Sequence, residues 1–225
     1  MYVYIYIKGA CEMTKRLKED DPDVVVSIGH SNATFAQAEN MIRAGATSVT
    51  HLFNCLSNLN NRDPGVIGLL GSNNNSHLPI YFGIIADGIH VHPASLQMAQ
   101  KCARDTLTLV TDAISSAGLP DGEHTVADQK ITIANGKAVV TATGVLVGST
   151  VFLDECVRVH MAATMSSLAV SAYAASTSSA KLLGLSNKGV LKRGADADIT
   201  FLTATGEVIA TIVQGDIAYC SPDRW

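Results

Sequence analysis

One arrangement recurs along the first half of the sequence: an apolar run rich in β-branched residues, then a polar turn, then a helical pattern. Strands buried on both faces of a parallel sheet have such near-continuous apolar runs, whereas half-exposed antiparallel strands alternate. We predict strands at 24–28, 48–53, 81–86 and 107–111, and helices at 35–44 and 94–103. Strands that alternate with helices indicate βαβ units, and hence an α/β fold with a parallel sheet.

Each of the four predicted strands carries a histidine or an aspartate at or near its carboxyl end. These residues are His30, His51, Asp87 with His90, and Asp112. In parallel sheets and barrels the carboxyl ends of the strands meet at one edge, where ligands bind and chemistry occurs. A single polar residue there is usually a cap, but four in succession predict a functional site at this edge.

The composition excludes several classes of protein. The 225 residues include 16 Lys and Arg against 20 Asp and Glu, whereas a nucleic-acid binder needs clustered basic residues. Hydrophobic residues make up 47% of the chain, too many for a disordered protein. The apolar opening at 1–7 is too short to span a bilayer and lacks the features of a signal peptide. Because the five cysteines are odd in number and form no Cys-x-x-Cys pair, we expect a cytoplasmic protein. The charge balance and the short apolar opening lead us to expect no nucleic-acid or membrane partner.

The second half of the sequence changes character. The stretch at 130–141 predicts a β-hairpin around the Asn-Gly pair at 135–136, and helices are predicted at about 151–165 and 167–183. Short apolar runs separated by glycines then predict a small β-module. We therefore divide the chain into a main domain, residues 1–187, and a C-terminal β-segment, residues 188–225.

The residues at the strand ends have the chemistry of a metal-dependent hydrolase. His30 and His51 come from neighbouring strands, and neutral imidazoles are good ligands for zinc and similar divalent ions. Asp112 can take a proton from a metal-bound water. His90 can hydrogen-bond a substrate oxygen, while Asp87 is expected to orient its loop. The guanidinium of Arg62 can bind a phosphate or a carboxylate in a two-pronged geometry.

Five short segments, in the same order, resemble those of the N-acetylglucosamine-6-phosphate deacetylases, which belong to the amidohydrolase superfamily. They are Gly-His-Ser-Asn-Ala-Thr at 29–34, Thr-His-Leu-Phe-Asn at 50–54, Asn-Arg-Asp-Pro-Gly at 61–65, Ile-Ala-Asp-Gly-Ile-His at 85–90 and Val-Thr-Asp-Ala at 110–113. The resemblance runs from about residue 24 to the C-terminus. It implies a (β/α)8 TIM-type barrel, incomplete at its N-terminus, with a small closing β-segment.

The resemblance also implies an activity and the residues that carry it. The activity is hydrolysis of the acetamide of N-acetyl-D-glucosamine 6-phosphate, with His30 and His51 as ligands of a divalent metal, zinc first and cobalt, iron or manganese as alternatives. Asp112 would be the general base, and His90 would bind the substrate and polarise its acetyl carbonyl. The sugar phosphate would be held by Asn54, Cys55 and Arg62, and by a loop made of Leu146, Val147 and Gly148. The arginine crosses a dimer interface in this family, so the resemblance implies a homodimer.

Three departures from the family pattern bear on the site. Cys55 stands where the family usually has alanine, and Val147 where it usually has serine. The family's third metal ligand, a glutamate after Ala-Pro, has no clear counterpart. Glu12 is the nearest acid, but it follows no Ala-Pro and its spacing to His30 is short. We expect Glu12 to be the first-turn acid of a helix at 13–18 instead.

Two other functions compete with deacetylation. One is a catalytically impaired, truncated relative or sugar-phosphate-binding remnant, because two histidines alone should hold a metal weakly. The other is a different amidohydrolase of the dihydroorotase or dipeptidase type. The loop at 61–65 argues against the second, because it resembles the family's sugar-phosphate loop.

Overall fold

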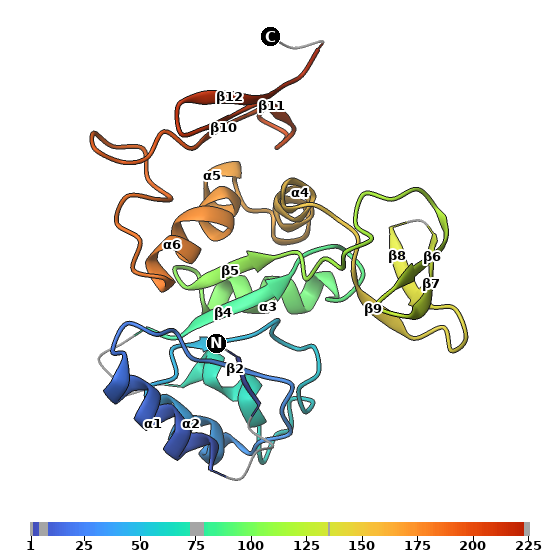
Figure 1. Ribbon diagram of the computed structural model, residues 1–225. Coiled ribbons are helices and arrows are strands. Elements are labelled where there is room, and N and C mark those ends of the chain that lie inside the picture. Colours follow the sequence, from blue (N-terminus) through green and yellow to red (C-terminus); the bar gives the residue numbers. More distant parts are fainter. Residues whose placement is uncertain (1, 5–8, 73–78, 135, 223–225) are drawn as a thin grey trace.

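The computed structural model describes residues 2–4, 9–72, 79–134 and 136–222, and it is built around one parallel sheet (Figure 1). The five strands lie in the order β1-β2-β3-β4-β5 and all neighbours are parallel. They are β1 (Tyr2–Tyr4), β2 (Ser27–Gly29), β3 (Ser48–Val49), β4 (Tyr81–Ile85) and β5 (Leu107–Val110). The predicted α/β class and parallel sheet are thereby confirmed.

One face of this sheet is covered by the helices that connect its strands. These are α1 (Ala10–Asp20), α2 (Phe35–Arg43) and α3 (Pro93–Cys102). Alternate strand residues, among them Ile28, Val49 and Ile84, are fully buried in one apolar core with Met41 of α2 and Leu96 of α3. Because strand side chains alternate between faces, the intervening residues lie on the opposite face of the sheet.

The start of α2 shows how the sequence sets these elements. Thr34 accepts a hydrogen bond from the Gln37 backbone N–H, and the Gln37 side chain accepts one from the Thr34 backbone N–H, which together form a capping box. The α3 helix begins with Pro93 at a position where the missing N–H costs nothing. Both helices match their predicted spans to within two residues.

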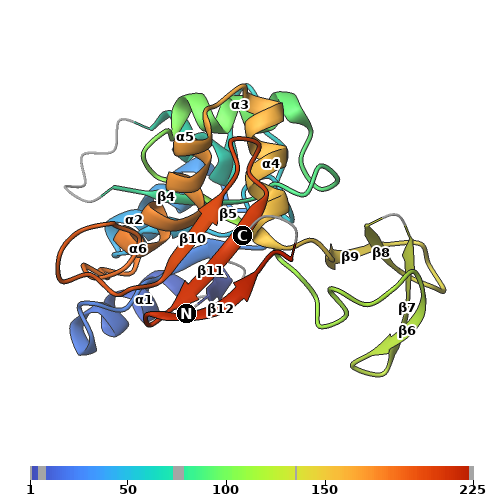
Figure 2. The ribbon, with the colours of Figure 1, turned by 90° about the horizontal axis from the view of Figure 1, so that it is seen from above.

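A four-stranded antiparallel sheet follows β5 and stands to one side of the main sheet (Figures 1 and 2). Its strands are β6 (Gly122–Val126), β7 (Gln129–Ala134), β8 (Lys137–Val140) and β9 (Leu146–Ser149). Strands β7 and β8 form the predicted hairpin, although Asn135 lies outside the described residues. The sequence did not predict β6, and it treated Leu146–Gly148 as a loop, whereas these residues belong to strand β9.

The last part of the chain contains helices and a small sheet. Helix α4 (Leu153–Thr164) is followed by a nearly continuous helix made of α5 (Leu168–Ala172), the π-helical turn η2 (Tyr173–Thr177) and α6 (Ser178–Leu182). Both helical predictions are confirmed. The antiparallel strands β10 (Ile199–Leu202), β11 (Val208–Val213) and β12 (Asp216–Cys220) form the three-stranded sheet seen in front in Figure 2.

Two elements of the main sheet differ from the predictions. Strand β3 ends at Val49 rather than at residue 53, because the chain turns from Thr50 onward and carries His51 out of the sheet. The 3-10 helix η1 (Gly65–Gly71), which starts after Pro64, was not predicted. Of the apolar opening at 1–7, only residues 2–4 are described, and they form strand β1.

The main sheet is open. Among the described strands, β1 pairs only with β2, and β5 pairs only with β4. A complete (β/α)8 barrel contains eight parallel strands, so five in sequential order fit part of such a barrel. No helix in the described part of the chain is long and apolar enough to cross a membrane.

Candidate active site at the carboxyl edge of the sheet

Two histidine rings meet at the carboxyl edge of the sheet. His30 follows β2, His51 follows β3, and their Nε2 atoms are 2.9 Å apart, with ring centroids separated by 4.7 Å. His51 is buried, and its Nδ1 has no hydrogen-bond partner within the described structure. Unsatisfied buried polar atoms are rare and often mark functional positions. The edge therefore brings together the two residues that the sequence predicted as metal ligands.

The backbone at this edge is unusual for residues other than glycine. His30, His51 and Asp112 all have positive φ angles, of 45°, 27° and 50°. Phe53 and Cys55, in the turn that follows β3, share this conformation. A left-handed backbone costs an L-residue of order 1–2 kcal/mol, and such strain concentrates at functional sites. The three predicted catalytic and metal-binding residues therefore share a costly conformation that turns the chain sharply at the strand ends.

Asp112 lies at the end of β5 and is held by β9. The Ser149 N–H donates to the Asp112 carbonyl oxygen at 2.9 Å, and the Ile114 N–H donates to the Ser149 carbonyl oxygen at 2.9 Å. Gly148 packs so closely that an added Cβ would lie 2.8 Å from that Asp112 oxygen. Leu146, Val147 and Gly148, which the sequence assigned to substrate binding, therefore belong to the strand that positions the backbone of Asp112. The Asp112 side chain itself is exposed.

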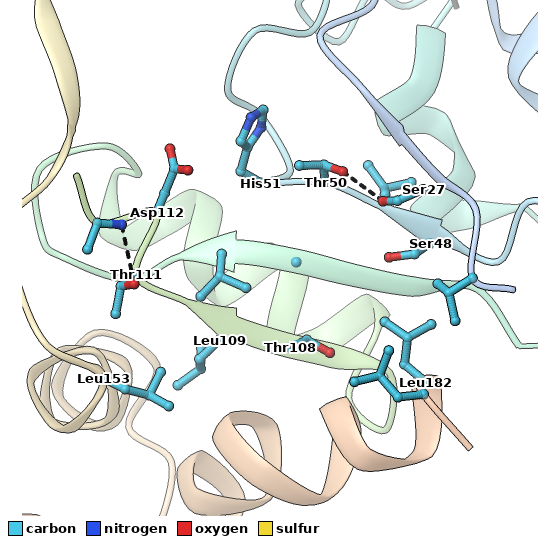
Figure 3. A pocket seen from close by; sticks show the side chains of 16 residues that line it. Ser27, Ser48, Thr50, His51, Thr108, Leu109, Thr111, Asp112, Leu153 and Leu182 are labelled. Carbon is cyan, nitrogen blue, oxygen red and sulfur yellow. Dashed lines mark hydrogen bonds between the residues drawn. The ribbon is translucent and has the colours of Figure 1, made fainter. Parts of the chain in front are cut away.

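A cavity of about 570 Å³ lies against the face of the sheet opposite the connecting helices. Its small polar lining residues come from alternate strand positions: Ser27, Ser48, Thr50 and Thr108. Leu153 and Leu182 line it from the C-terminal helices, and His51 and Asp112 lie at the carboxyl end, on the same side of the sheet (Figure 3). We call these four residues the polar lining of the cavity. It was not predicted, although small polar residues at every second position of the apolar strands could have indicated it.

Hydrogen bonds between hydroxyl groups fix the polar lining of the cavity. The hydroxyl groups of Ser27 and Thr50 are 2.7 Å apart, as drawn in Figure 3. Those of Thr108 and Ser178, which join β5 to α6, are 3.1 Å apart. Because buried hydroxyls are costly without a partner, these pairs allow a polar surface to exist beneath the site.

Asp87 and His90 form a tightly bound pair after β4. The His90 Nδ1 atom lies 2.5 Å from Asp87 Oδ2, and Asp87 Oδ1 accepts the backbone N–H groups of Ile89 and His90. Burial alone would raise the pKa of the Asp87 carboxyl, but the hydrogen bonds from the His90 side chain and from these two N–H groups outweigh it, so the pKa is lowered. Asp87 thus orients its loop, as the sequence predicted.

The predicted sugar-phosphate residues lie on the turns next to the histidines. The Cys55 carbonyl oxygen accepts the Ser31 N–H at 2.9 Å, which ties the turn after His51 to the segment after His30. Asn54 is half-buried, and its side-chain amide donates to the Leu52 carbonyl oxygen at 3.4 Å. Arg62 is exposed on a loop. The structure therefore places Cys55 beside the two histidines at the carboxyl edge of the sheet. It leaves Arg62 exposed to solvent.

Sequence reasoning missed one residue that organises this loop. Asp63 Oδ1 accepts the backbone N–H of Phe35 at 2.8 Å and that of Gly65 at 3.1 Å. One carboxylate thereby joins the Arg62 loop to the first turns of both α2 and η1. An aspartate directly before Pro-Gly was the available signal, because this residue type favours turns and helix starts.

Glu12 does not complete a metal site with the histidines. It lies in the first turn of α1 and is exposed, as predicted for a first-turn acid. Across the described ranges, no group of three or more His, Cys, Asp or Glu side chains is placed to hold a metal ion. The helix begins earlier than predicted, at Ala10 rather than at residue 13.

The two imidazoles fit as part of a metal site. Ligand nitrogens about 2.0–2.1 Å from a tetrahedral zinc ion are roughly 3.3 Å from each other. The observed separation of 2.9 Å between the Nε2 atoms is a few tenths of an ångström shorter, so a small movement of either ring would suffice. A structural or catalytic zinc ion usually has at least three protein ligands. The two imidazoles would therefore supply two of them.

The parallel sheet, with its strands in sequential order and two imidazoles meeting at its carboxyl edge, is typical of α/β-barrel proteins that bind their ligands at this edge. Residues 7–218 match the model of the amidohydrolase family. The chain therefore belongs to the amidohydrolase family, whose members are generally metal-dependent.

Curated relatives of this chain agree with the resemblance noted in the sequence. The N-acetylglucosamine-6-phosphate deacetylase of Danio rerio is 43% identical over 197 residues, which cover 85% of this chain and 48% of the relative. That of Bacillus subtilis is 34% identical over 214 residues, covering 94% and 52%. An N-acetylgalactosamine-6-phosphate deacetylase of Escherichia coli O157:H7 is also 34% identical, covering 94% and 54%. The chain thus spans about half the length of these relatives.

Solved structures show the same likeness. The N-acetylglucosamine-6-phosphate deacetylase of Thermotoga maritima superposes with a TM-score of 0.87 at 30% identity, over 98% of this chain and 59% of that one. A variant of the Mycobacterium smegmatis deacetylase, in complex with N-acetyl-D-glucosamine 6-phosphate, gives 0.86 at 29% identity, over 96% and 56%. The open sheet is therefore the counterpart of part of a deacetylase barrel.

Proposed function

We propose that this chain carries the catalytic edge of an N-acetylglucosamine-6-phosphate deacetylase. The reaction is hydrolysis of the acetamide of N-acetyl-D-glucosamine 6-phosphate to D-glucosamine 6-phosphate and acetate. The observation that supports this most is the meeting of His30 and His51 at the edge where Asp112 also lies, in a chain whose relatives bear that name.

We assign His30 and His51 to a divalent metal ion, zinc first, with cobalt, iron or manganese as alternatives. When bound, such an ion polarises a carbonyl oxygen and lowers the pKa of a water toward about 7. The protein's part is to hold two imidazoles with their Nε2 atoms facing, which the turns after β2 and β3 accomplish.

Asp112 is the residue that moves the proton. It takes a proton from the attacking water while the water oxygen bonds to the acetyl carbon. It then gives this proton to the amide nitrogen as the C–N bond breaks, which releases the amine and acetate. A carboxylate that is exposed and lines the cavity suits both steps, because it is within reach of a bound substrate and of water.

The sugar phosphate is held by the turns around the histidines. In this proposal Asn54, Cys55 and Arg62 bind it on one side, and Leu146, Val147 and Gly148 bind it on the other. Cys55 and Val147 replace the family's usual alanine and serine, so we assign their contacts to the backbone. His90, in the loop after β4, binds the substrate.

We also propose a cytoplasmic homodimer. The exposed guanidinium of Arg62 is free to reach the substrate of a second copy, as the family resemblance implies. None of the five cysteines is in a disulfide, which suits a reducing compartment.

A second function is favoured by one observation. Because the described residues hold no group of three metal-ligating side chains, the chain can also be a sugar-phosphate-binding relative with weak metal affinity. Binding without turnover distinguishes this from the deacetylase. Tests with cyclic amides and dipeptides as substrates distinguish the dihydroorotase or dipeptidase alternative from the deacetylase.

The test is release of glucosamine 6-phosphate by the purified chain in the presence of added zinc or cobalt. We expect turnover by the original chain and a loss of 10²-fold or more in kcat for Asp112→Asn, the size typical of a lost acid–base group. Near-normal turnover by Asp112→Asn would exclude the assigned role. Binding of the sugar phosphate by a folded chain without turnover would instead favour the second function.

A further inference from the structure

The carboxylate of Asp87 is bound at both of its oxygens. Oδ1 accepts two backbone N–H groups, from Ile89 at 2.9 Å and from His90 at 2.8 Å. Oδ2 lies 2.5 Å from the Nδ1 atom of His90. The Asp87 side chain is fully buried, and that of His90 is only 10% exposed, so neither group can turn away without breaking these bonds.

This arrangement places a hydrogen on Nδ1 of His90. An ionised carboxylate only accepts hydrogen bonds, so a contact of 2.5 Å with Nδ1 requires the hydrogen to be on Nδ1. Asp87 stays ionised at neutral pH because the bonds from His90 and the backbone lower its pKa in spite of its burial. In the neutral imidazole the lone pair is then on Nε2.

The free nitrogen of His90 is available to a ligand. Within the described part of the chain, no hydrogen bond is assigned to Nε2, and this atom is not among the buried polar atoms without a partner. Its strand, β4, lies between β3, which precedes His51, and β5, which precedes Asp112. His90 therefore follows the strand that lies between the strands of His51 and Asp112.

We propose that Asp87 is a positioning residue that holds His90 with its proton on Nδ1, so that Nε2 accepts a hydrogen bond from an O–H or N–H group of the ligand. The identity of that ligand as an amino-sugar phosphate rests on the function proposed above. The inference changes the role expected for His90. A carbonyl oxygen only accepts hydrogen bonds, so a His90 ring whose only N–H is on Nδ1 binds a donor group of the substrate and does not polarise its acetyl carbonyl.

The variant Asp87→Asn makes the inference testable without a change of shape. The two backbone N–H groups need an acceptor, so they keep the side-chain oxygen of the asparagine at the position of Oδ1. The amide nitrogen then occupies the position of Oδ2 and donates to Nδ1. His90 must respond by moving its proton to Nε2, which converts the ligand-facing nitrogen from an acceptor to a donor.

The experiment is long-range ¹H–¹⁵N correlation NMR of the histidine rings in the ¹⁵N-labelled chain at pH 8. His90 is assigned with His90→Gln. In the original chain we expect a protonated-type signal for Nδ1 and an unprotonated-type signal for Nε2, with the two exchanged in Asp87→Asn. Asp128→Asn, which removes an exposed carboxylate from the β6–β7 turn, should leave both signals unchanged. An unprotonated Nδ1 in the original chain would overturn the inference, even if Asp87→Asn failed to fold.

Addition of N-acetyl-D-glucosamine 6-phosphate separates this inference from the proposed function. We expect the Nε2 signal of the original chain to shift on binding. Shifts of other site residues without a shift of Nε2 would overturn the ligand-binding role of His90 while leaving the proposed function intact. If no residue responds and no glucosamine 6-phosphate is released, the proposed function fails, and the tautomer pattern still decides whether Asp87 positions His90.

Discussion

Among individual residues, the histidines show how the environment decides the role of one side chain. His160 is fully buried between helices, where Nδ1 pairs with the Ser171 hydroxyl at 2.8 Å and Nε2 with the Gln100 side-chain oxygen at 2.9 Å. Burial lowers the pKa of His160 from 6.5 to about 4. It is a satisfied core residue, in contrast to His51, whose Nδ1 has no partner in the described structure.

The lowered pKa of His160 predicts a loss of stability in acid. Between pH 6.5 and about 4 the unfolded chain binds a proton at this residue that the folded chain excludes. The stabilising effect is complete above pH 6.5 and is lost as the pH falls, by about 3 kcal/mol in total. Urea unfolding of the original chain and of His160→Gln, carried out between pH 6.5 and 4, measures this pH dependence of the free energy of unfolding. A free energy of unfolding with the same pH dependence in both proteins would contradict the assignment.

The sequence predicted which residues lie at the site but not the backbone that presents them. His30, His51 and Asp112 could be identified because polar residues that end apolar strands are conspicuous. Their positive φ angles could not be predicted, because this conformation is uncommon for any residue other than glycine and only the surrounding turns impose it. The hydrogen bond between Asp87 and His90 could not be predicted from the sequence either.

At the scale of elements, the contact between β9 and Asp112 links the antiparallel sheet to the catalytic edge. Gly148 has a φ of +53°, and a Cβ there would lie 2.7 Å from the Ile114 side chain and 2.8 Å from the Asp112 carbonyl oxygen. Gly144, in the connection between β8 and β9, offers a matched position with a φ of +67° and open space around it. The two glycines therefore separate the cost of the backbone conformation from the cost of the clash.

We predict that Gly148→Ala destabilises the protein more than Gly144→Ala does. Both variants bear the penalty of a left-handed backbone, about 1–2 kcal/mol. Only Gly148→Ala adds a clash, which costs about another 1–3 kcal/mol and moves Asp112. Chemical denaturation measures the free energies of unfolding, and the deacetylase assay should show a loss of kcat for Gly148→Ala alone. Equal stability of the two variants would show that β9 does not hold Asp112.

Elements whose pattern reflects burial were predictable, and those set by turns were not. The strands β2, β4 and β5 and the helices α2 and α3 bury apolar residues, which leaves a clear signal. Strand β3 is shorter than predicted because the chain turns at Thr50, and η1 follows from Pro64 and the Asp63 bonds rather than from periodicity. Strand β6 carries mostly exposed polar residues, so it left no apolar pattern.

At the scale of the whole molecule, an open five-stranded sheet carries residues that a complete barrel would enclose. The chain spans about half the length of its curated relatives, from 48% to 54%. Its fold class followed from the strand pattern, whereas the extent of the barrel and the substrate followed from resemblance to a family. The division at residue 188 stays a prediction.

The central claim is that the carboxyl edge of this sheet forms a metal site, and calorimetric titration of the chain with zinc tests it most directly. We predict binding of about one ion per chain, abolished by His51→Ala. His124→Ala should leave binding unchanged, because His124 lies on β6 and its ring pairs with the Pro120 carbonyl oxygen at 2.8 Å. Zinc binding that survives His51→Ala, or a folded chain that binds no zinc, would contradict the account.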